Sequence, residues 1–385
     1  MKKTIIILIS IFFCVTSLSY AQNINWNLTG AGARAAGFGG AFIGVADDAT
    51  AISWNPAGLT QLIDPEASAV MRYITDTYKT DESGRTESES LGNFVPNFAS
   101  GVYPFNFPGL KVVAAVAYQQ QLDLYTKWNF EEFTKGEATG GASNISLGLA
   151  AEILPIFSIG LASNVWTGSM ELDSEWWIDN EWIPFEFTED FSGFNFNAGA
   201  MINLSNLSNP IPVKIGVDFK SPFDLEGDFG EGTETIQMPA MIGFGASVQL
   251  GDNFTVSADY ETRAYKDKEI SYDDGSEPDI ISDYNLDQIR AGAEFLVVTD
   301  FAVIPLRAGF HTVPTIFSNY EDYPNNPKDQ VVGSGFAVGT GLIFEKFALD
   351  ATATFDSYKQ ELTSGGDYSQ VSSMIFTLSG IFYLN

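Results

Sequence analysis

Apolar and polar residues alternate from residue 66 to the C-terminus, in segments of about ten to fifteen residues separated by turn-forming residues. In segment 194–204, for example, every second residue from Phe194 to Leu204 is apolar, and Asn195 and Asn197 lie between them. Because successive side chains of a β-strand point to opposite faces, this alternation predicts strands with one apolar and one polar face. We expect about fourteen strands, at 66–78, 95–104, 111–125, 143–154, 156–172, 191–204, 211–223, 236–250, 253–269, 285–298, 302–314, 331–344, 347–359 and 371–385.

The connections between these strands alternate in length. The short ones are 105–109, 154–155, 205–209, 251–253, 299–301 and 345–346, and the connections between them are long. Outer-membrane barrels have short turns at one end, long loops at the other and an even number of strands. The pattern therefore predicts an all-β membrane protein, a transmembrane β-barrel of about fourteen antiparallel strands. The alternative is a soluble β-sandwich, which also alternates but rarely has so many long strands or such regular loops.

Charged residues collect on the polar face of these strands. A Lys or Arg that faced lipid at mid-bilayer would cost about 2–4 kcal/mol, so the charged face must line the barrel interior. The expected lumen network is Lys214, Asp218, Asp259, Arg263, Arg290, Glu294, Arg307 and His311. His311 is the only histidine in the sequence, so a metal centre or a catalytic triad would have to be built on it alone. We expect no metal, no cofactor and no enzymatic activity.

Residues 1–21 have the features of an export signal: two lysines, an apolar run and Ser19-Tyr20-Ala21 as the cleavage site. Removal of this leader takes away Cys14, the only cysteine. The formal net charge of −30 excludes nucleic acid as a partner, because phosphates would be repelled. After the leader no run of about 18 apolar residues occurs, so helical membrane spans are not expected.

Residues 22–62 do not alternate, and we expect them to fill the barrel formed by 63–385 as a plug. Small residues dominate 32–41, which permits backbone to pack closely against backbone. The two aspartates at 47 and 48 are expected to cap a short helix over 49–54, which the residue before Pro56 would end. A phosphate-binding loop is rejected because no predicted strand precedes the glycines and no Gly-Lys-Ser/Thr follows them. The plug residues singled out are Gly37, Gly39, Gly40, Asp47, Asp48, Asn55, Pro56 and Ala57.

An aromatic cluster lies outside the predicted strands, between 172 and 191. It contains Trp176, Trp177, Trp182 and Phe185. Such a cluster on a loop would be unfavourable unless it packs or binds something. We expect it to be either an aromatic girdle at the outer membrane interface or a ligand-binding entrance patch for apolar molecules. The acidic run 271–277 lacks the ligand spacing of an EF-hand calcium loop.

The plug sequence GARAAGFGGAFIGVADDATAISWNPAGL, at 32–59, resembles the N-terminal hatch of the FadL/TodX family of outer-membrane transporters for hydrophobic compounds. Residues 154–160, 217–222 and 306–310 are similar to strand segments of that family. The resemblance implies a fourteen-stranded barrel closed by the hatch. It further implies passive uptake of long-chain fatty acids, alkanes or aromatic hydrocarbons, which leave sideways into the membrane.

The resemblance also implies a lateral gap at a kinked third strand next to Asn55-Pro56-Ala57. The corresponding segment, 111–125, contains no glycine or proline that would locate the kink, and Gln119–Gln121 is the polar run expected to line it. The implied protein is a monomer in the outer membrane of a Gram-negative bacterium. Its partners would be hydrophobic small molecules, outer-membrane lipids and the barrel-assembly machinery.

A related branch with a similar hatch serves in protein secretion across the outer membrane. A barrel component that docks secreted cargo is therefore the alternative function. Lipid-like compounds retained by the purified barrel would favour uptake, whereas co-purification with large secretion subunits would favour docking.

Overall fold

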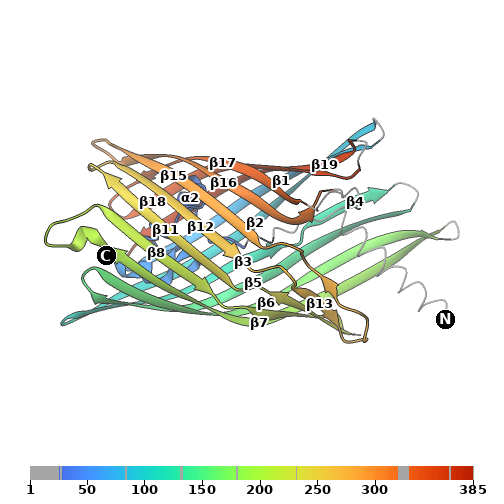
Figure 1. Ribbon diagram of the computed structural model, residues 1–385, viewed down its shortest axis with the longest axis horizontal. Helices are drawn as coiled ribbons and strands as arrows, with labels where there is room; N and C mark the ends of the chain where they lie inside the picture. Colours follow the sequence, from blue (N-terminus) through green and yellow to red (C-terminus); the bar gives the residue numbers. More distant parts are fainter. Residues whose placement is uncertain are drawn as a thin grey trace.

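The chain forms a closed barrel. The computed structural model describes residue 26 and residues 28–82, 85–130, 133–178, 181–230, 232–319, 329–363 and 366–384; the expected leader, 1–21, lies outside these residues. Within them, fourteen antiparallel strands make up the wall, and the barrel closes where β1 pairs with β19 from Glu66↔Tyr383 to Asp81↔Tyr368. Figure 1 shows the strands running along the long axis, with the short connections at one end and the long hairpins at the other.

The fourteen expected strands are confirmed, although many are longer than predicted. The wall strands are β1 (Glu66–Glu82), β2 (Arg85–Phe107), β3 (Leu110–Asp123), β5 (Thr134–Leu154), β6 (Phe157–Ile178), β7 (Glu181–Asn203), β8 (Val213–Lys220), β11 (Met241–Leu250), β12 (Phe254–Arg263), β15 (Leu286–Val298), β16 (Val303–Ser318), β17 (Gln330–Ile343), β18 (Phe347–Glu361) and β19 (Tyr368–Tyr383). Five shorter strands extend the wall: β4 (Thr126–Phe130), β9 (Phe223–Asp228), β10 (Thr233–Met238), β13 (Glu269–Tyr272) and β14 (Asp279–Ile280). We call the end with the short connections the turn end and the opposite one the loop end.

The outer face carries an apolar band, as the alternation predicts. Leu147 is 66% exposed and Phe194 is 58% exposed on this face, whereas Asn164 and Asn195 are buried on the inner face. Towards the loop end the outward residues of β6 become polar, as at Glu171, yet the strand continues because these positions no longer meet lipid. The wall therefore extends well beyond the membrane on this side.

The aromatic residues expected outside the strands lie within this extension, which corrects the prediction. Trp176 and Trp177 belong to β6, and Trp182 and Phe185 belong to β7. The two strands pair without interruption from Phe157↔Ile202 to Ile178↔Glu181. The prediction failed because acidic outward residues were taken as the end of each strand.

Residues 28–62, the inner segment, lie inside the barrel. The segment contains α2 (Ala33–Gly37), α3 (Ala51–Trp54) and a 3-10 helix, η1 (Pro56–Gln61). The helix expected over 49–54 is present but shorter, and no side chain caps it; Asp48 instead accepts a hydrogen bond from the Thr50 amide at 2.8 Å. It ends at Asn55, as expected from Pro56. No helix in the described part of the chain is long and apolar enough to cross a membrane.

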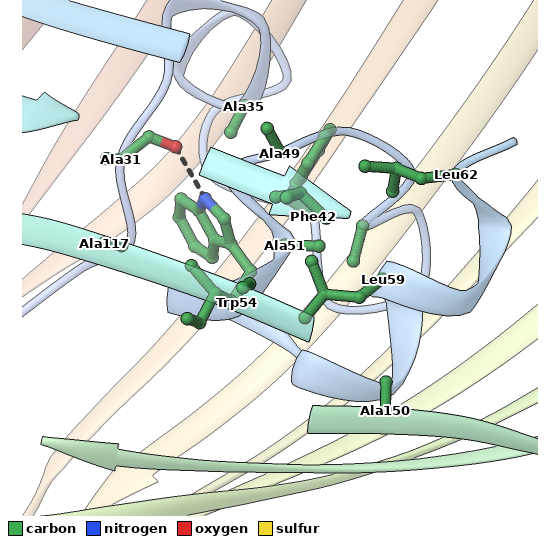
Figure 2. Close-up of a cluster of buried hydrophobic side chains, with 14 of the residues drawn as sticks. Ala31, Ala35, Phe42, Ala49, Ala51, Trp54, Leu59, Leu62, Ala117 and Ala150 are labelled. Atoms are coloured by element: carbon green, nitrogen blue, oxygen red, sulfur yellow. Dashed lines mark hydrogen bonds between the residues drawn. The ribbon is translucent and has the colours of Figure 1, made fainter. Parts of the chain in front are cut away.

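The inner segment has an apolar core that continues into the wall. Figure 2 shows Trp54 packed beside Ala117 of β3, with its indole nitrogen donating to the Ala31 carbonyl at 2.8 Å. Phe42 meets Trp54 edge-on, with 6.1 Å between ring centroids. Buried aromatic side chains each remove about 150–250 Å² from water, so burial of Phe42 and Trp54 contributes several kcal/mol to the folding of the segment inside the barrel.

Candidate functional site

Ion pairs fasten the first half of the inner segment to the wall. Arg34 of α2 pairs with Asp47 within the segment and with Glu294 of β15, whose carboxylate is 3.2 Å away. Arg307 of β16 bridges the same Glu294 at 2.6 Å and Asp350 of β18 at 2.5 Å. The result is a chain of alternating charges from the segment across three strands. Because each buried charge has an opposite partner, removal of any one would leave another uncompensated.

A second set of charges holds the other side of the segment. Glu261 pairs with Arg290 at 2.9 Å and with Arg263. Lys220 donates to the Ser53 carbonyl at 3.2 Å, and Asp259 accepts the Ile43 amide at 2.8 Å.

The remaining residues of the expected lumen network also lie on the inner face. Lys214 lies 3.6 Å from Asp47, and Asp218 is fully buried. His311 pairs with Asp356 at 2.9 Å. The structure thus places the predicted charges inside, and it gathers most of them around the inner segment. Among the described residues no group of three or more potential metal ligands occurs.

Glycines let the inner segment approach the wall backbone to backbone. Gly39 has a φ of +65°, and a side chain added there would lie 2.7 Å from the backbone nitrogen of Phe310. Gly40, with a φ of +78°, lies against Arg290, and Gly37 lies against Arg307. These three predicted plug positions therefore contact β15 and β16 directly.

Asn55, Pro56 and Ala57 contact another part of the wall. The Asn55 side chain donates to the carbonyls of Ile43 (3.1 Å) and Ala200 (3.2 Å) and accepts the Ala57 amide (3.1 Å). Ala200 belongs to β7, whose ladder with β8 is intact. Asn55 was expected to hold a strand where pairing breaks for a lateral gap, and this prediction is wrong, because the break lies elsewhere.

Pairing in the wall is interrupted between β2 and β3. The two strands pair from Phe107↔Leu110 to Phe98↔Gln119 and, in the described residues, no further, although β2 continues along β1 to Arg85. We call the unpaired stretch of 85–97 and 120–123 the seam. Only side chains cross it there: Asn97 donates to the Gln120 carbonyl at 3.1 Å, and Asn93 donates to Asp123 at 2.8 Å.

The seam coincides with a bulge of β3 against β5. Its register shifts between Gln120 and Leu122, which pair with Ser143 and Ala142, and the next pair is Asp123↔Gly141. Gly141 has a φ of +148°, and a side chain there would overlap the Leu122 carbonyl. The glycines that permit the irregularity are in β5, which explains why the sequence of the third strand alone did not locate it.

A cavity of about 150 Å³ lies directly behind the seam. Arg72 of β1 lines this seam cavity; its guanidinium donates to the Gly30 carbonyl at 3.3 Å, and its Nε atom is buried without a partner among the described residues. No described carboxylate pairs with Arg72. The rest of the lining contains polar residues of the seam, three aspartates and a group of apolar side chains: Ile74, Leu91, Val95, Leu124, Ile316 and Phe317. Sequence analysis missed Arg72, although it is the one basic residue in the expected strand 66–78.

A smaller cavity, of about 40 Å³, lies on the other side of residues 26–30. Lys220 and Arg263 line this inner cavity together with Asn144, Asn164, Asn195 and Asn197. Leu28 faces the inner cavity, whereas Trp26 and Thr29 face the seam cavity. Residue 26 and residues 28–30, which we call the partition, therefore separate the two cavities.

Side chains of the wall donate hydrogen bonds to backbone carbonyls of the partition. Arg263 donates to the Leu28 carbonyl at 2.7 Å, and Gln119 donates to the Thr29 carbonyl at 2.9 Å. Tyr265 donates to the Trp26 carbonyl at 3.2 Å. These donors leave the side chains of the partition free to line the cavities.

An apolar cluster lies inside the loop end of the barrel. This loop-end cluster consists of Leu122, Leu124, Ala138, Ala142, Trp166, Met170, Leu172, Phe191, Leu225, Ile236 and Met238. Trp26 and Leu28 of the partition pack against it, so it is continuous with the lining of both cavities. An apolar lining thus extends from the loop end to the seam.

The four predicted ligand-binding aromatics are divided between the two faces of the wall. Phe185 packs against the loop-end cluster, and Trp176 shares its inward face. Trp177 and Trp182 point outward and contact each other, with 5.3 Å between ring centroids. The structure therefore does not bring the four together into one patch.

No family model and no curated protein matches the sequence. Solved structures do match the fold. The toluene transporter TodX of Pseudomonas putida aligns with 93% of this chain and 99% of its own, with a TM-score of 0.66 and 13% identity. A FadL homologue from Pseudomonas aeruginosa aligns with 91% of this chain and 98% of its own (TM-score 0.62, 15% identity).

The toluene transporter TbuX of Ralstonia pickettii aligns with 94% of this chain and 100% of its own (TM-score 0.60, 14% identity). Each alignment covers nearly the whole barrel, so the likeness extends beyond a general resemblance among barrels. The chain therefore has the fold of the FadL/TodX group of channels for hydrophobic compounds.

Proposed function

We propose that this protein is a channel of the bacterial outer membrane for the passive uptake of hydrophobic compounds, which leave the barrel sideways through the seam. The compounds are long-chain fatty acids, alkanes or aromatic hydrocarbons. The observation that carries the proposal is the loss of pairing between β2 and β3 with a cavity directly behind it. Backbone groups that lack a ladder partner leave a gap, and in the described part of the chain the hydrogen bonds across it come from Asn93 and Asn97.

The inner segment supports a sideways route because it fills the axial one. We propose that residues 22–62 act as a hatch and residues 63–385 as the barrel. Ion pairs and glycine contacts attach the described part of the hatch to strands on several sides of the wall. An apolar solute would have to break these buried pairs to pass along the axis, whereas the seam is bridged by a few hydrogen bonds worth about 0.5–1.5 kcal/mol each.

The lining suits a molecule with an apolar body and a small polar end. The loop-end cluster would receive the apolar body at the extracellular side. In the seam cavity, the unpaired Nε of Arg72 offers a charge-assisted hydrogen bond to a carboxylate, and the apolar wall beside it accommodates a chain. TodX and TbuX are toluene transporters, which supports uptake of apolar compounds as the common activity of this fold.

An engineered disulfide across the seam tests the proposal. Cys14 is the only cysteine and lies in the segment expected to be removed, so the Asn97→Cys, Gln120→Cys pair would be alone in the mature chain. Oxidation should close the seam and lower the uptake of labelled oleate, hexadecane or toluene, and reduction should restore it in the same cells. The matched control is Ser100→Cys, Ala117→Cys, which joins two residues already paired in the ladder and should leave uptake unchanged.

Equal uptake by the oxidised and reduced seam variant, with the disulfide verified by mass spectrometry, would exclude this exit. If the inserted protein supports no uptake of any of the three compound classes, the docking role in protein secretion becomes the better explanation.

A further inference from the structure

Two carboxylates lie within the otherwise apolar inner face at the loop end. Glu189 of β7 is opposite Met170 of β6. On the same face of β7 it lies between Phe187 and Phe191. Glu234 of β10 is opposite Gly227 of β9, which is itself opposite Phe191. Because paired residues of a ladder point to the same side, both acidic side chains point towards the loop-end cluster.

The wall is built to seat these two side chains together. The position between them is Gly227, where an added side chain would overlap the Glu189 carboxylate and lie 3.1 Å from the Cγ of Glu234. Glu189 is only 6% exposed, and its Oε1 atom has no hydrogen-bond donor among the described residues. A buried acceptor without a donor is unfavourable, and more so when it is charged.

No cation in the described part of the chain compensates this pair. Neither glutamate takes part in an ion pair of the described residues, and the segments 173–190, 224–235 and 270–284 around them contain no Lys or Arg. Burial raises the pKa of the Glu189 carboxyl, and the charge of the neighbouring Glu234 and a hydrogen bond between the two side chains raise it further. Both residues lie beyond the apolar outer band, on the extracellular side of the barrel.

We propose that Glu189 and Glu234 bind the ammonium group of a hydrophobic amine whose apolar part lies against the loop-end cluster. A primary ammonium supplies the hydrogen-bond donors that Oε1 lacks and the positive charge that the pair lacks. The rings of Phe187 and Phe191 flank the pair and favour a cation further. The inference rests on the proposed function in one respect, since it assumes that ligands enter at the loop end.

Chain-matched probes test this binding site directly. The full-length mature protein in nanodiscs would be titrated by calorimetry with octylammonium, octanol and octanoate, which share one apolar chain and differ in the head group. Octylammonium should bind at least tenfold more tightly than octanol, whereas octanoate, which Arg72 can bind in the seam cavity, reports binding outside the proposed amine site. Equal affinities for octylammonium and octanol in the unmodified protein would overturn the proposal without any variant.

A pair of double variants locates the site. Glu189→Gln with Glu234→Gln should abolish the tenfold preference for octylammonium and leave octanol binding unchanged. Glu171→Gln with Glu226→Gln removes two exposed carboxylates from the outward face of β6 and β9, the strands paired with β7 and β10, and should keep the preference. If both double variants lose it equally, general surface charge explains the binding and the proposed site is wrong.

Heat-modifiable migration on gels verifies that each barrel is folded. If the double variant does not insert into the membrane, Glu234→Gln alone, at the less buried position, replaces it in the titration. Failure of this proposal is distinguishable from failure of the proposed function. The seam disulfide experiment uses oleate, hexadecane and toluene, none of which carries an amine.

Discussion

Replacement of Asn55 by Leu should loosen the hatch without unfolding the barrel. Asn55 is fully buried and makes three hydrogen bonds, to the Ile43 carbonyl, the Ala200 carbonyl and the Ala57 amide. Leucine fills a similar space but bonds to none of them. All three groups lose this partner; the carbonyl of Ile43 and the amide of Ala57 lie inside the hatch, whereas the Ala200 carbonyl belongs to the β7 ladder.

The structure sets the size of the effect. Each buried group left unsatisfied costs about 1–3 kcal/mol, so two groups lower the free energy that seats the hatch by about 2–6 kcal/mol. Even the lower value raises the population of the loosened hatch about thirtyfold, since every 1.4 kcal/mol is a factor of ten. The barrel ladders do not involve the Asn55 side chain, so the midpoint of global unfolding in urea should change much less.

Hydrogen exchange measured by mass spectrometry distinguishes loosening of the hatch from unfolding of the barrel. Amides of residues 31–62 should exchange at least tenfold faster in Asn55→Leu, whereas amides of β7 and β8 should not change. Uptake of hydrophobic compounds should fall, and leakage of small sugars into proteoliposomes should rise. Asn203→Leu is the matched control, because among the described residues the Asn203 side chain accepts a hydrogen bond only from the Ser205 amide, at the turn end. Unchanged exchange of 31–62 in Asn55→Leu would refute the assignment of Asn55 as an anchor.

Three further predictions concern the hatch, the seam cavity and the bulge. Deletion of residues 30–59 should open a wide channel lined by the charged inner face, and single-channel conductance no greater than that of the intact protein would show that this stretch does not close the barrel. Arg72→Gln should weaken binding of oleate about tenfold while binding of hexadecane is unchanged. Arg85→Gln, at an 84% exposed side chain, is the control. An equal loss of binding for oleate and hexadecane in Arg72→Gln would argue against a carboxylate contact. Gly141→Val should displace β3 at Leu122 and lower uptake severalfold with the barrel still heat-modifiable, whereas Gly101→Ala, which would meet only Val116 at 3.9 Å, should not; normal uptake by Gly141→Val would separate the bulge from the exit.

The sequence by itself determined the barrel. Alternation of apolar and polar residues is a local property, because the energetic cost of a charge in lipid acts on each strand separately. It therefore predicted fourteen wall strands and the inward direction of residues such as Arg290 and Glu294 before their partners were known. The close packing of the hatch could also be predicted from its small residues, since close backbone contact excludes large side chains whatever the partner is.

Only the tertiary structure decided where the wall is open and which inward groups have no partner. The seam depends on glycines in β5 that permit a bulge in β3, and the two strands are about twenty residues apart along the chain. In the sequence Arg72 looks like an ordinary lumen charge and Glu189 falls in a predicted loop; in the folded barrel both point inward, and among the described residues no opposite charge pairs with them as it does with Arg290 and Glu294. Partners come from distant strands brought together by register, so pairing or its absence is a property of the closed barrel and not of any segment.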